Sequence, residues 1–150
     1  MSRPYVPVNL KLAVIERAKG CCEYCLSQAK FSPDTLSVEH ITPYARGGTN
    51  DFDNLAASCQ CCNNLKYILV EAIDPLTGEL APLFHPRRDR WNDHFGWNKD
   101  YTLMVGRTAT GRATIEKMDL NREGVVNLRR LLAGGKLHPP KMQEPDEEKR

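Results

Sequence analysis

A glutamate and a histidine stand side by side in the run Val38-Glu39-His40-Ile41 of this 150-residue chain. Neutral imidazole, with an ordinary pKa of about 6.5, can accept a proton from water at physiological pH. A carboxylate is the type of oxygen ligand that a hard divalent cation such as Mg²⁺ prefers. Taken singly, His40 is a surface or hydrogen-bonded residue and Glu39 a solvated charge. Taken together, they are candidates for the hydrolysis of a phosphodiester, which needs a base and a cation.

Three further polar residues follow within thirty positions, namely Asn54, Asn63 and Lys66. Each alone has an ordinary explanation, as a turn or cap residue, a polar residue on a helix and a solvated charge. An amide oxygen, however, is a second ligand of the type that Mg²⁺ accepts, and the ion keeps several waters. With Glu39 and His40, these residues therefore supply what a phosphodiesterase site requires.

The six cysteines fall into two close groups, Cys21, Cys22 and Cys25 first, then Cys59, Cys61 and Cys62. Two residues separate Cys22 from Cys25 and Cys59 from Cys62, a spacing that lets both thiolates of a pair reach one zinc ion. Cys21 or Cys61 could still take a neighbour's place as ligand, and a redox-active pair is the alternative to zinc. Four thiolates close the coordination shell, so this zinc is predicted to be structural.

Together these motifs resemble the HNH, or ββα-metal, endonucleases of the zinc-containing four-cysteine type, as found in small bacterial HNH proteins. The matching residues are Cys22, Cys25, the run Val38–Pro43, Gly47-Gly48, Asn54-Leu55, Cys59, Cys62, Asn63 and Lys66. The resemblance implies that His40 is the general base and that Glu39 and Asn63 hold a catalytic Mg²⁺ or Mn²⁺. It also implies that Asn54 braces the loop and orients the histidine.

Two positions depart from the family pattern. Aspartate is common where this chain has Glu39, and the longer side chain changes the geometry of the cation site. Many members have histidine where this chain has Asn63, and an amide oxygen favours magnesium or manganese over softer metals.

The resemblance implies a metal-dependent endonuclease acting on DNA, with double-stranded DNA as the expected partner. Candidate nucleic-acid contacts are Lys66, Arg46, Arg87 and Arg88. In the sequence, the arginines near position 87 lie close to Trp91, Phe95 and Trp97. Such aromatic residues either bind nucleic acid or complete a small core. We favour the core. The alternative function is a catalytically inactive, zinc-stabilised module that binds nucleic acid.

The predicted fold class is α+β, a small ββα-metal core stapled by the zinc site, with flanking helices and a C-terminal α/β extension. Patterning predicts a helix over 8–19 that ends at Gly20, strands over 35–41 and 55–57, and a helix from 60 to about 72. Neighbouring side chains of a strand point to opposite faces, so Glu39 and His40 can share one site only if the strand ends near Thr42-Pro43. Further along, we expect a strand over 101–105, a strand or helix over 112–118, and a helix over 122–133 capped by Asn121.

These elements suggest a nuclease core over residues 1–73, an extension packed on it over 74–135, and a disordered tail over 136–150. The composition, 41% hydrophobic and 27% charged, is that of an ordinary globular protein. No apolar run approaches transmembrane length and no signal-peptide pattern is present, so we expect a cytoplasmic protein with no membrane partner. The net charge of +2 is small and does not predict strong nonspecific binding to DNA. We therefore expect that a protein partner could help the chain to recognise DNA.

Overall fold

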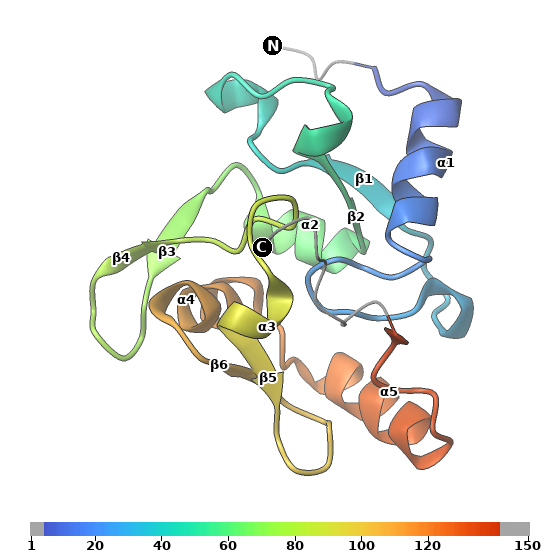
Figure 1. Cartoon of the computed structure of the whole chain (residues 1–150), viewed down its shortest axis with the longest axis vertical. Helices are drawn as coiled ribbons and strands as arrows, with labels where there is room; N and C mark the ends of the chain where they lie inside the picture. Colours follow the sequence, from blue (N-terminus) through green and yellow to red (C-terminus); the bar gives the residue numbers. More distant parts are fainter. Residues whose placement is uncertain (1–4, 142–150) are drawn as a thin grey trace. The chain divides into compact units, whose positions relative to one another are not determined.

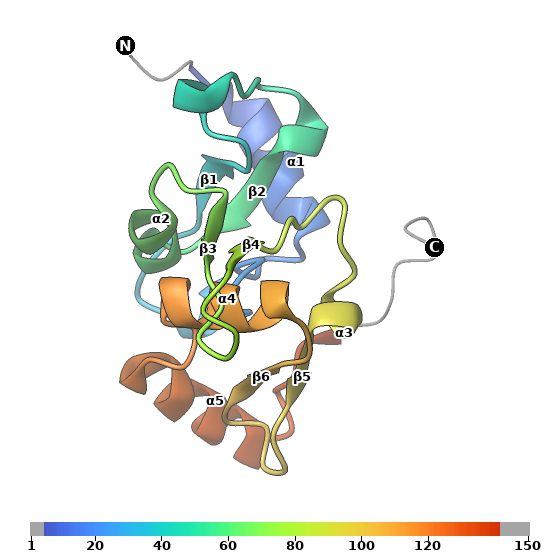
Figure 2. The ribbon, with the colours of Figure 1, turned by 90° about the vertical axis from the view of Figure 1, so that its left-hand side faces the viewer.

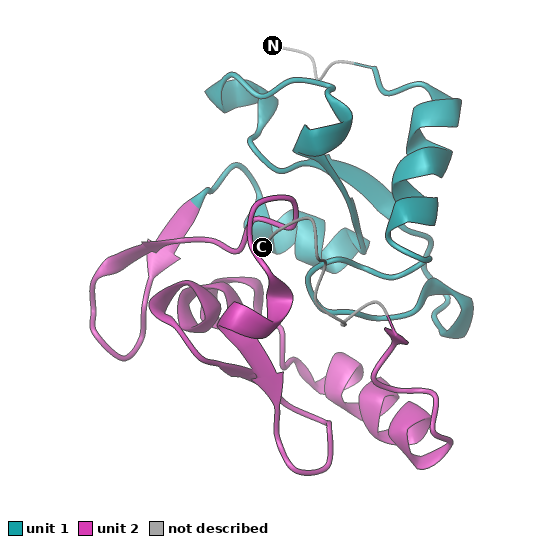
Figure 3. Cartoon of the chain, in the orientation of Figure 1, with its two compact units in different colours: residues 1–70 teal, residues 71–150 magenta. Residues whose placement is uncertain are grey.

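The computed structural model describes residues 5–141 and divides into two compact units, residues 1–70 and 71–150 (Figure 3). Both units combine helices with short two-stranded antiparallel sheets, which confirms the predicted α+β class. Strand β3 (Glu71–Ile73) belongs to the second unit because it pairs with β4 (Leu80–Pro82). The unit boundary therefore precedes β3, whereas the sequence analysis places it after residue 73.

The first unit contains the helices α1 (Val8–Arg17) and α2 (Gln60–Lys66) and the strands β1 (Ser37–His40) and β2 (Leu55–Ser58). Short 3₁₀ turns cover Ala29–Phe31, Tyr44–Arg46 and Phe52–Asn54. The strands pair antiparallel, with Ser37 opposite Ser58 and His40 opposite Leu55. Figures 1 and 2 show α1 and α2 on opposite sides of this strand pair. This arrangement of two strands and a helix is the one predicted for the core.

Helix α1 covers one side of the strand pair with an apolar face. Val14 and Ala18 are fully buried there with Leu55 and Ala57 of β2. The helix ends at Arg17, two residues earlier than predicted, and Lys19 is the first residue after it with a left-handed φ, of 54°. Gly20 follows with φ 72°, and its N–H donates to the Ile15 carbonyl at 3.0 Å.

Helix α2 is shorter than the sequence predicts, because it ends at Lys66 and not near residue 72. Tyr67 follows with φ 51° and ψ −126°, a backbone conformation that interrupts the helical ladder. Ala72, which the helical spacing included, is instead buried in β3, opposite Ala81 of β4. An apolar residue at this position suits either element, so spacing alone could not locate the end of the helix.

The second unit continues with α3 (Trp91–His94), β5 (Phe95–Trp97), β6 (Met104–Gly106), α4 (Ala109–Met118) and α5 (Glu123–Gly134). Its aromatic residues pack on one another. Phe95 is 1% exposed, and its ring centroid lies 5.1 Å from that of Phe84 and 5.5 Å from that of Trp91. The interpretation of these aromatics as core is therefore confirmed.

Asn121 does not cap α5 as the sequence suggests, because Arg122 is the residue before that helix and makes no side-chain cap. The Asn121 amide instead pairs with the backbone of Met104, accepting its N–H at 2.8 Å and donating to its carbonyl at 2.9 Å. The ambiguous segment 112–118 is part of helix α4, whose N-cap Thr108 accepts the Gly111 N–H at 3.1 Å.

The predicted disordered tail covers residues 136–150, of which residues 136–141 are described by the structure. His138 is 7% exposed. Its Nε2 lies 2.9 Å from the Tyr101 carbonyl, and its ring packs edge-on against Trp97 at 4.6 Å. Residues 136–141 therefore contact the second unit, whereas residues 142–150 lie outside the described part of the chain.

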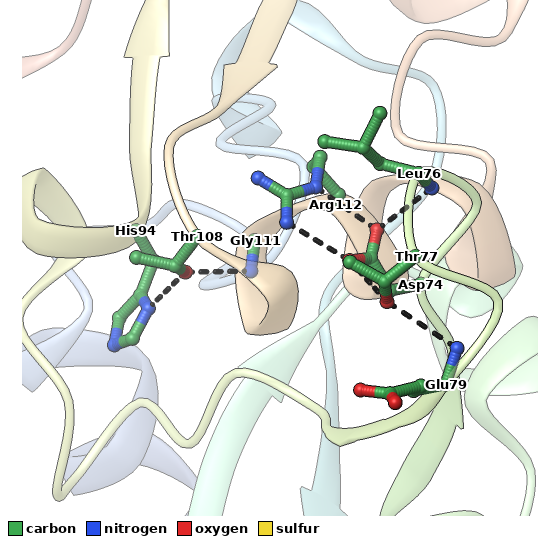
Figure 4. Close-up of polar contacts among 8 residues, drawn as sticks. All are labelled: Asp74, Leu76, Thr77, Glu79, His94, Thr108, Gly111 and Arg112. Atoms are coloured by element: carbon green, nitrogen blue, oxygen red, sulfur yellow. Dashed lines mark hydrogen bonds and ion pairs between the residues drawn. The ribbon is translucent and has the colours of Figure 1, made fainter.

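Asp74 organises the turn between β3 and β4 and ties it to α4 (Figure 4). Its carboxylate accepts two hydrogen bonds from Arg112, from Nε and Nη2, both at 2.9 Å. It also accepts the Leu76 N–H and the Thr77 hydroxyl, each at 3.0 Å. The Arg112 bonds hold the pKa of Asp74 well below its usual range.

We expect this carboxylate to make the second unit acid-labile. Because its folded pKa is lower than its unfolded value of about 3.9, the stability it contributes is complete above about pH 5 and is lost as the pH falls. Thermal unfolding between about pH 7 and about pH 2 should therefore show Asp74→Asn well below the wild type at neutral pH, with the gap closing in acid. The exposed Asp34→Asn serves as control, and a gap that stays constant throughout would contradict this role.

Candidate active site

Glu39 and His40 occupy the end of β1 and point in different directions. β1 ends at His40, just before Thr42-Pro43, as the sequence analysis requires. Glu39 contacts Tyr24 and Lys66, and His40 contacts Asn50. Both nevertheless line one pocket of about 320 Å³ in the first unit. Two neighbouring residues at the end of the strand therefore both border the same pocket.

His40 is held by a residue that the sequence analysis did not identify. The imidazole is 4% exposed, and its Nε2 lies 2.7 Å from Oδ1 of Asn50. Asn50 donates from Nδ2 to the Tyr5 carbonyl at 2.8 Å, which orients its amide so that Oδ1 faces the ring. Since Oδ1 only accepts, Nε2 is the ring nitrogen that donates in this contact, and Nδ1 is the nitrogen available for the role of a general base.

Asn54 braces the loop that follows His40. Its Oδ1 accepts the Thr42 N–H at 2.8 Å, while its Nδ2 donates to the carbonyls of Thr42 at 3.0 Å and Thr49 at 2.8 Å. Gly48 is needed at this crossing, because a Cβ there would lie 1.7 Å from the Thr42 carbonyl oxygen. The bonds of Asn54 thus go to the backbone of the loop, and the imidazole receives its contact from Asn50.

Glu39 lies in a buried polar cluster. Its side chain is 1% exposed and accepts a hydrogen bond from the Tyr24 hydroxyl. Its Oε2 lies 3.3 Å from Nζ of Lys66. Burial raises the pKa of Glu39, and the Lys66 charge and the Tyr24 hydroxyl oppose that rise. Burial and the neighbouring Glu39 also raise the pKa of Tyr24, which keeps its hydroxyl protonated as a donor.

Lys66 occupies a different environment from the nucleic-acid surface at which the sequence analysis places it. It is 1% exposed, and it donates to the Ile41 carbonyl at 2.9 Å in addition to its ion pair with Glu39. A buried carboxylate is costly unless it is paired. The ammonium group of Lys66 therefore neutralises Glu39 in the interior. Lys66 is not an exposed cationic group of the first unit.

Asn63 precedes Lys66 by three residues on α2, and residues so spaced lie on one face of a helix. Asn63 is therefore on the same face of α2 as Lys66, the residue that pairs with Glu39. Among residues 5–141 the one group of three or more His, Cys, Asp and Glu side chains able to share a metal is made of cysteines. The pocket that His40 lines includes Glu39, and Asn63 is not among its lining residues.

Four cysteines converge at a second centre in the same unit. The sulfur atoms of Cys22, Cys25, Cys59 and Cys62 all lie within 4.8 Å of one another. The Cys25 and Cys59 sulfurs are 3.8 Å apart, and four thiolates around zinc, with bonds of about 2.3 Å, are separated by about 3.8 Å. Cys61 is exposed and Cys21 contacts the Lys19 carbonyl, so the cluster consists of the four residues that the spacing favours.

This cysteine cluster is connected to the strand that carries Glu39 and His40. Tyr24, between Cys22 and Cys25, donates to Glu39, and the neighbouring Glu23 accepts the Ala57 N–H of β2 at 2.8 Å. Burial raises the pKa of the Cys22 thiol, whereas hydrogen bonds with the other three cysteines lower the pKa of Cys25. A cation bound among the four sulfur atoms would stabilise the thiolate form of all of them.

The three predicted arginine contacts are divided between the two units. Arg46 lies in the first unit, is exposed, and donates from Nε to the Ile68 carbonyl at 2.5 Å. Arg87 and Arg88 lie in the second unit, where their backbone N–H groups each donate to Nδ1 of His85 at 3.2 Å. Arg46 is therefore the predicted arginine that the structure places beside the pocket, whose lining includes Ile68.

Residues 22–67 match the family described as HNH endonuclease. That segment includes both cysteine pairs, Glu39, His40 and the two asparagines, so the resemblance seen in the sequence is confirmed and a nuclease-type function is supported. Over 137 residues the chain is 27% identical to the Septu protein PtuB of Bacillus thuringiensis, covering 89% of this chain and 48% of that protein. The chain therefore spans about half the length of this curated relative. No solved structure matches, and no helix within residues 5–141 is long and apolar enough to cross a membrane.

Proposed function

We propose that this protein is a metal-dependent endonuclease that hydrolyses phosphodiester bonds in double-stranded DNA. The observation that carries the proposal is the contact that orients His40, whose Nε2 lies 2.7 Å from Oδ1 of Asn50, so that Nδ1 is available to act as the base. His40 and Glu39 both line one pocket, which supports their use at a single site. The match of residues 22–67 to the HNH endonucleases supports this chemistry.

In the proposed reaction, His40 takes a proton from water as the water oxygen attacks phosphorus. The new P–O bond forms while the bond to the 3′ oxygen breaks, and that oxygen leaves with the electron pair. Asn50 stabilises the resulting imidazolium, because its Oδ1 accepts the Nε2–H. Asn54 keeps the loop after His40 in place through its backbone bonds. A Mg²⁺ or Mn²⁺ ion held by Glu39 and Asn63, when bound, supplies positive charge beside the phosphate and the leaving oxygen.

The four-cysteine cluster is proposed to hold a structural zinc ion. Its shell is closed by Cys22, Cys25, Cys59 and Cys62, which leaves no position for water or substrate. The segment between Cys22 and Cys25 also carries Tyr24, whose hydroxyl donates to Glu39. Zinc would thus stabilise the first unit and position the site, while the chemistry takes place at His40.

Contacts to DNA are proposed for Arg46 beside the pocket and for Arg87 and Arg88 in the second unit. A guanidinium group binds phosphate through charge and hydrogen bonds and adds no sequence information. The small net charge of +2 supports the further suggestion that a protein partner helps to target the enzyme. We place the protein in the cytoplasm.

Supercoiled plasmid incubated with Mg²⁺ or Mn²⁺ tests the proposal. The purified chain should nick or linearise the plasmid, and His40→Ala should lower the rate by about 10²- to 10⁴-fold, the usual contribution of a general base. His94→Gln is the matched control, because His94 contacts Thr108 in the second unit and has no part in the proposed chemistry. Equal cleavage by the wild type and His40→Ala would contradict the assigned base.

The alternative function is a zinc-stabilised module that binds nucleic acid and has no activity. One observation favours it: Glu39 already has Lys66 as a cationic partner at 3.3 Å, so its charge is neutralised in the interior. Under this alternative the wild type binds the plasmid but leaves it intact at every concentration of Mg²⁺ and Mn²⁺. The same plasmid experiment therefore separates the two functions.

A further inference from the structure

We propose that Tyr44 and Tyr67 form a subsite at the His40 pocket that stacks on an unpaired nucleobase beside the scissile phosphate. The inference rests on the proposed endonuclease function and defines its substrate more closely, as DNA in which a nucleotide has left the base stack. The pocket is lined by Glu39, His40, Pro43, Tyr44, Ala45, Tyr67 and Ile68. The lining thus includes His40, the proposed general base, and both tyrosines.

The size of the pocket suits one nucleotide better than a segment of duplex. Its volume is about 320 Å³, near the lower end of the range of about 300–1,000 Å³ for ligand pockets. A duplex presents its phosphates outside and its bases stacked inside, so a pocket that holds both a base and a phosphate requires an extruded or unpaired nucleotide.

The two tyrosine rings are available to a ligand. Tyr44 is 39% exposed and Tyr67 is 70% exposed, so both side chains present surface to the solvent. Within residues 5–141 neither ring takes part in a ring–ring or cation–ring contact. Exposed aromatic faces are the surfaces on which unpaired bases stack in nucleic-acid-binding proteins, with tolerance for base identity.

The backbone of Tyr67 provides independent support for a functional role. Its φ of 51° with ψ of −126° is a combination that favours glycine. Its N–H still bonds to the Asn63 carbonyl at 3.0 Å, so the conformation is held by the end of α2. A bulky residue kept in such a conformation is a pointer to function, and here it carries an exposed ring at the pocket.

Arg46 completes the subsite by joining its two sides. Tyr44 and Arg46 belong to one 3₁₀ turn, and the Arg46 Nε donates to the carbonyl of Ile68, the residue after Tyr67. The bond ties the segment that carries Tyr44 to the segment that carries Tyr67. It also places a guanidinium group, with further N–H donors, where the phosphates flanking a stacked base would lie.

Binding to three matched DNA duplexes tests the subsite. The first is fully paired, the second carries one unpaired thymine, and the third has an abasic nucleotide in place of that thymine. Fluorescence anisotropy without added Mg²⁺ or Mn²⁺ should show the wild type binding the unpaired thymine about 10- to 100-fold more tightly than the abasic nucleotide, the worth of one stacked base. Tyr67→Phe should keep this preference, and Tyr67→Leu should reduce it strongly.

Tyr67→Leu and Tyr67→Phe both retain a Cβ in the same backbone conformation, so the comparison isolates the aromatic ring. The double variant Tyr44→Leu/Tyr67→Leu should bind the thymine and abasic duplexes equally. A thymine preference that survives in this double variant, or that is absent from the wild type, would overturn the subsite.

Adding Mg²⁺ or Mn²⁺ to the same duplexes separates this inference from the endonuclease proposal. A tyrosine-dependent thymine preference without cleavage would overturn the endonuclease and retain the base-binding subsite. Cleavage by the wild type with no dependence on the unpaired thymine would overturn the subsite and retain the endonuclease. Photocrosslinking of 5-iodouracil at the unpaired position, followed by peptide mass spectrometry, should identify Tyr44 or Tyr67 as the residue in contact.

Discussion

Cys25→Ser is expected to release the bound metal and unfold the first unit, the largest effect that we predict for a single substitution. Cys25 is 1% exposed, and its sulfur lies in the four-cysteine cluster. A structural zinc site contributes about 10–16 kcal/mol of apparent binding free energy, which equals or exceeds the whole stability of about 5–15 kcal/mol of an ordinary domain. Serine cannot replace the thiolate, so the site is expected to lose most of this free energy.

The measurement combines the zinc content of the purified protein with its circular dichroism and melting curve. The wild type should contain one zinc per chain, and chelation should produce the same loss of structure as Cys25→Ser. Cys61→Ser is the matched control, because Cys61 belongs to the same cysteine-rich segment but is exposed and outside the cluster. A Cys25→Ser protein with unchanged zinc content and melting temperature would show that the cluster is not a structural metal site.

The second large effect is expected from Lys66→Met, which should lower the free energy of unfolding by about 3–5 kcal/mol. Lys66 and Glu39 are each 1% exposed, so removing the ammonium leaves a buried carboxylate without its cation. The Tyr24 hydroxyl alone cannot neutralise that charge. Exposed lysines carry no such cost, and Lys11→Met on α1 should change stability by less than about 0.5 kcal/mol.

Denaturant unfolding of the two lysine variants and of the double variant Glu39→Leu/Lys66→Met measures the effect. The double variant should recover most of the stability, because replacing both members of a buried ion pair by apolar groups is often neutral. It should nevertheless fail to cleave DNA if Glu39 holds the catalytic cation. Equal stability of Lys66→Met and Lys11→Met would contradict the role of Lys66 as the interior partner of Glu39.

The pairing of Glu39 with Lys66 also bears on the glutamate found where related sequences often have aspartate. The carboxylate of Glu39 reaches Tyr24 near the cysteine cluster and Lys66 on α2. It also forms part of the pocket lining with His40. The side chain therefore lies between the segment that carries the four-cysteine cluster and the proposed site, which gives it a structural role beside the proposed ligand role.

Those features that depend on short stretches of chain could be predicted from the sequence. Two intervening residues allow Cys22 and Cys25, or Cys59 and Cys62, to reach one ion, because that spacing is set by local covalent geometry. The strand before Thr42 and the end of α1 shortly before Gly20 follow from local backbone preferences. The position of Glu39 beside His40 was likewise evident without a structure.

Only the tertiary structure decided which partners these residues meet. Asn50 orients His40 because the loop between β1 and β2, braced by Asn54, brings it back to the imidazole. Lys66 meets Glu39 because Lys66 is the last residue of α2 and this end of the helix lies against β1. Such contacts join residues distant in sequence, and their choice depends on loop path and helix length, which neither composition nor spacing determines. The sequence alone therefore determined the kinds of groups at the site, while the fold decided that Glu39 is buried and that Asn50 orients the histidine.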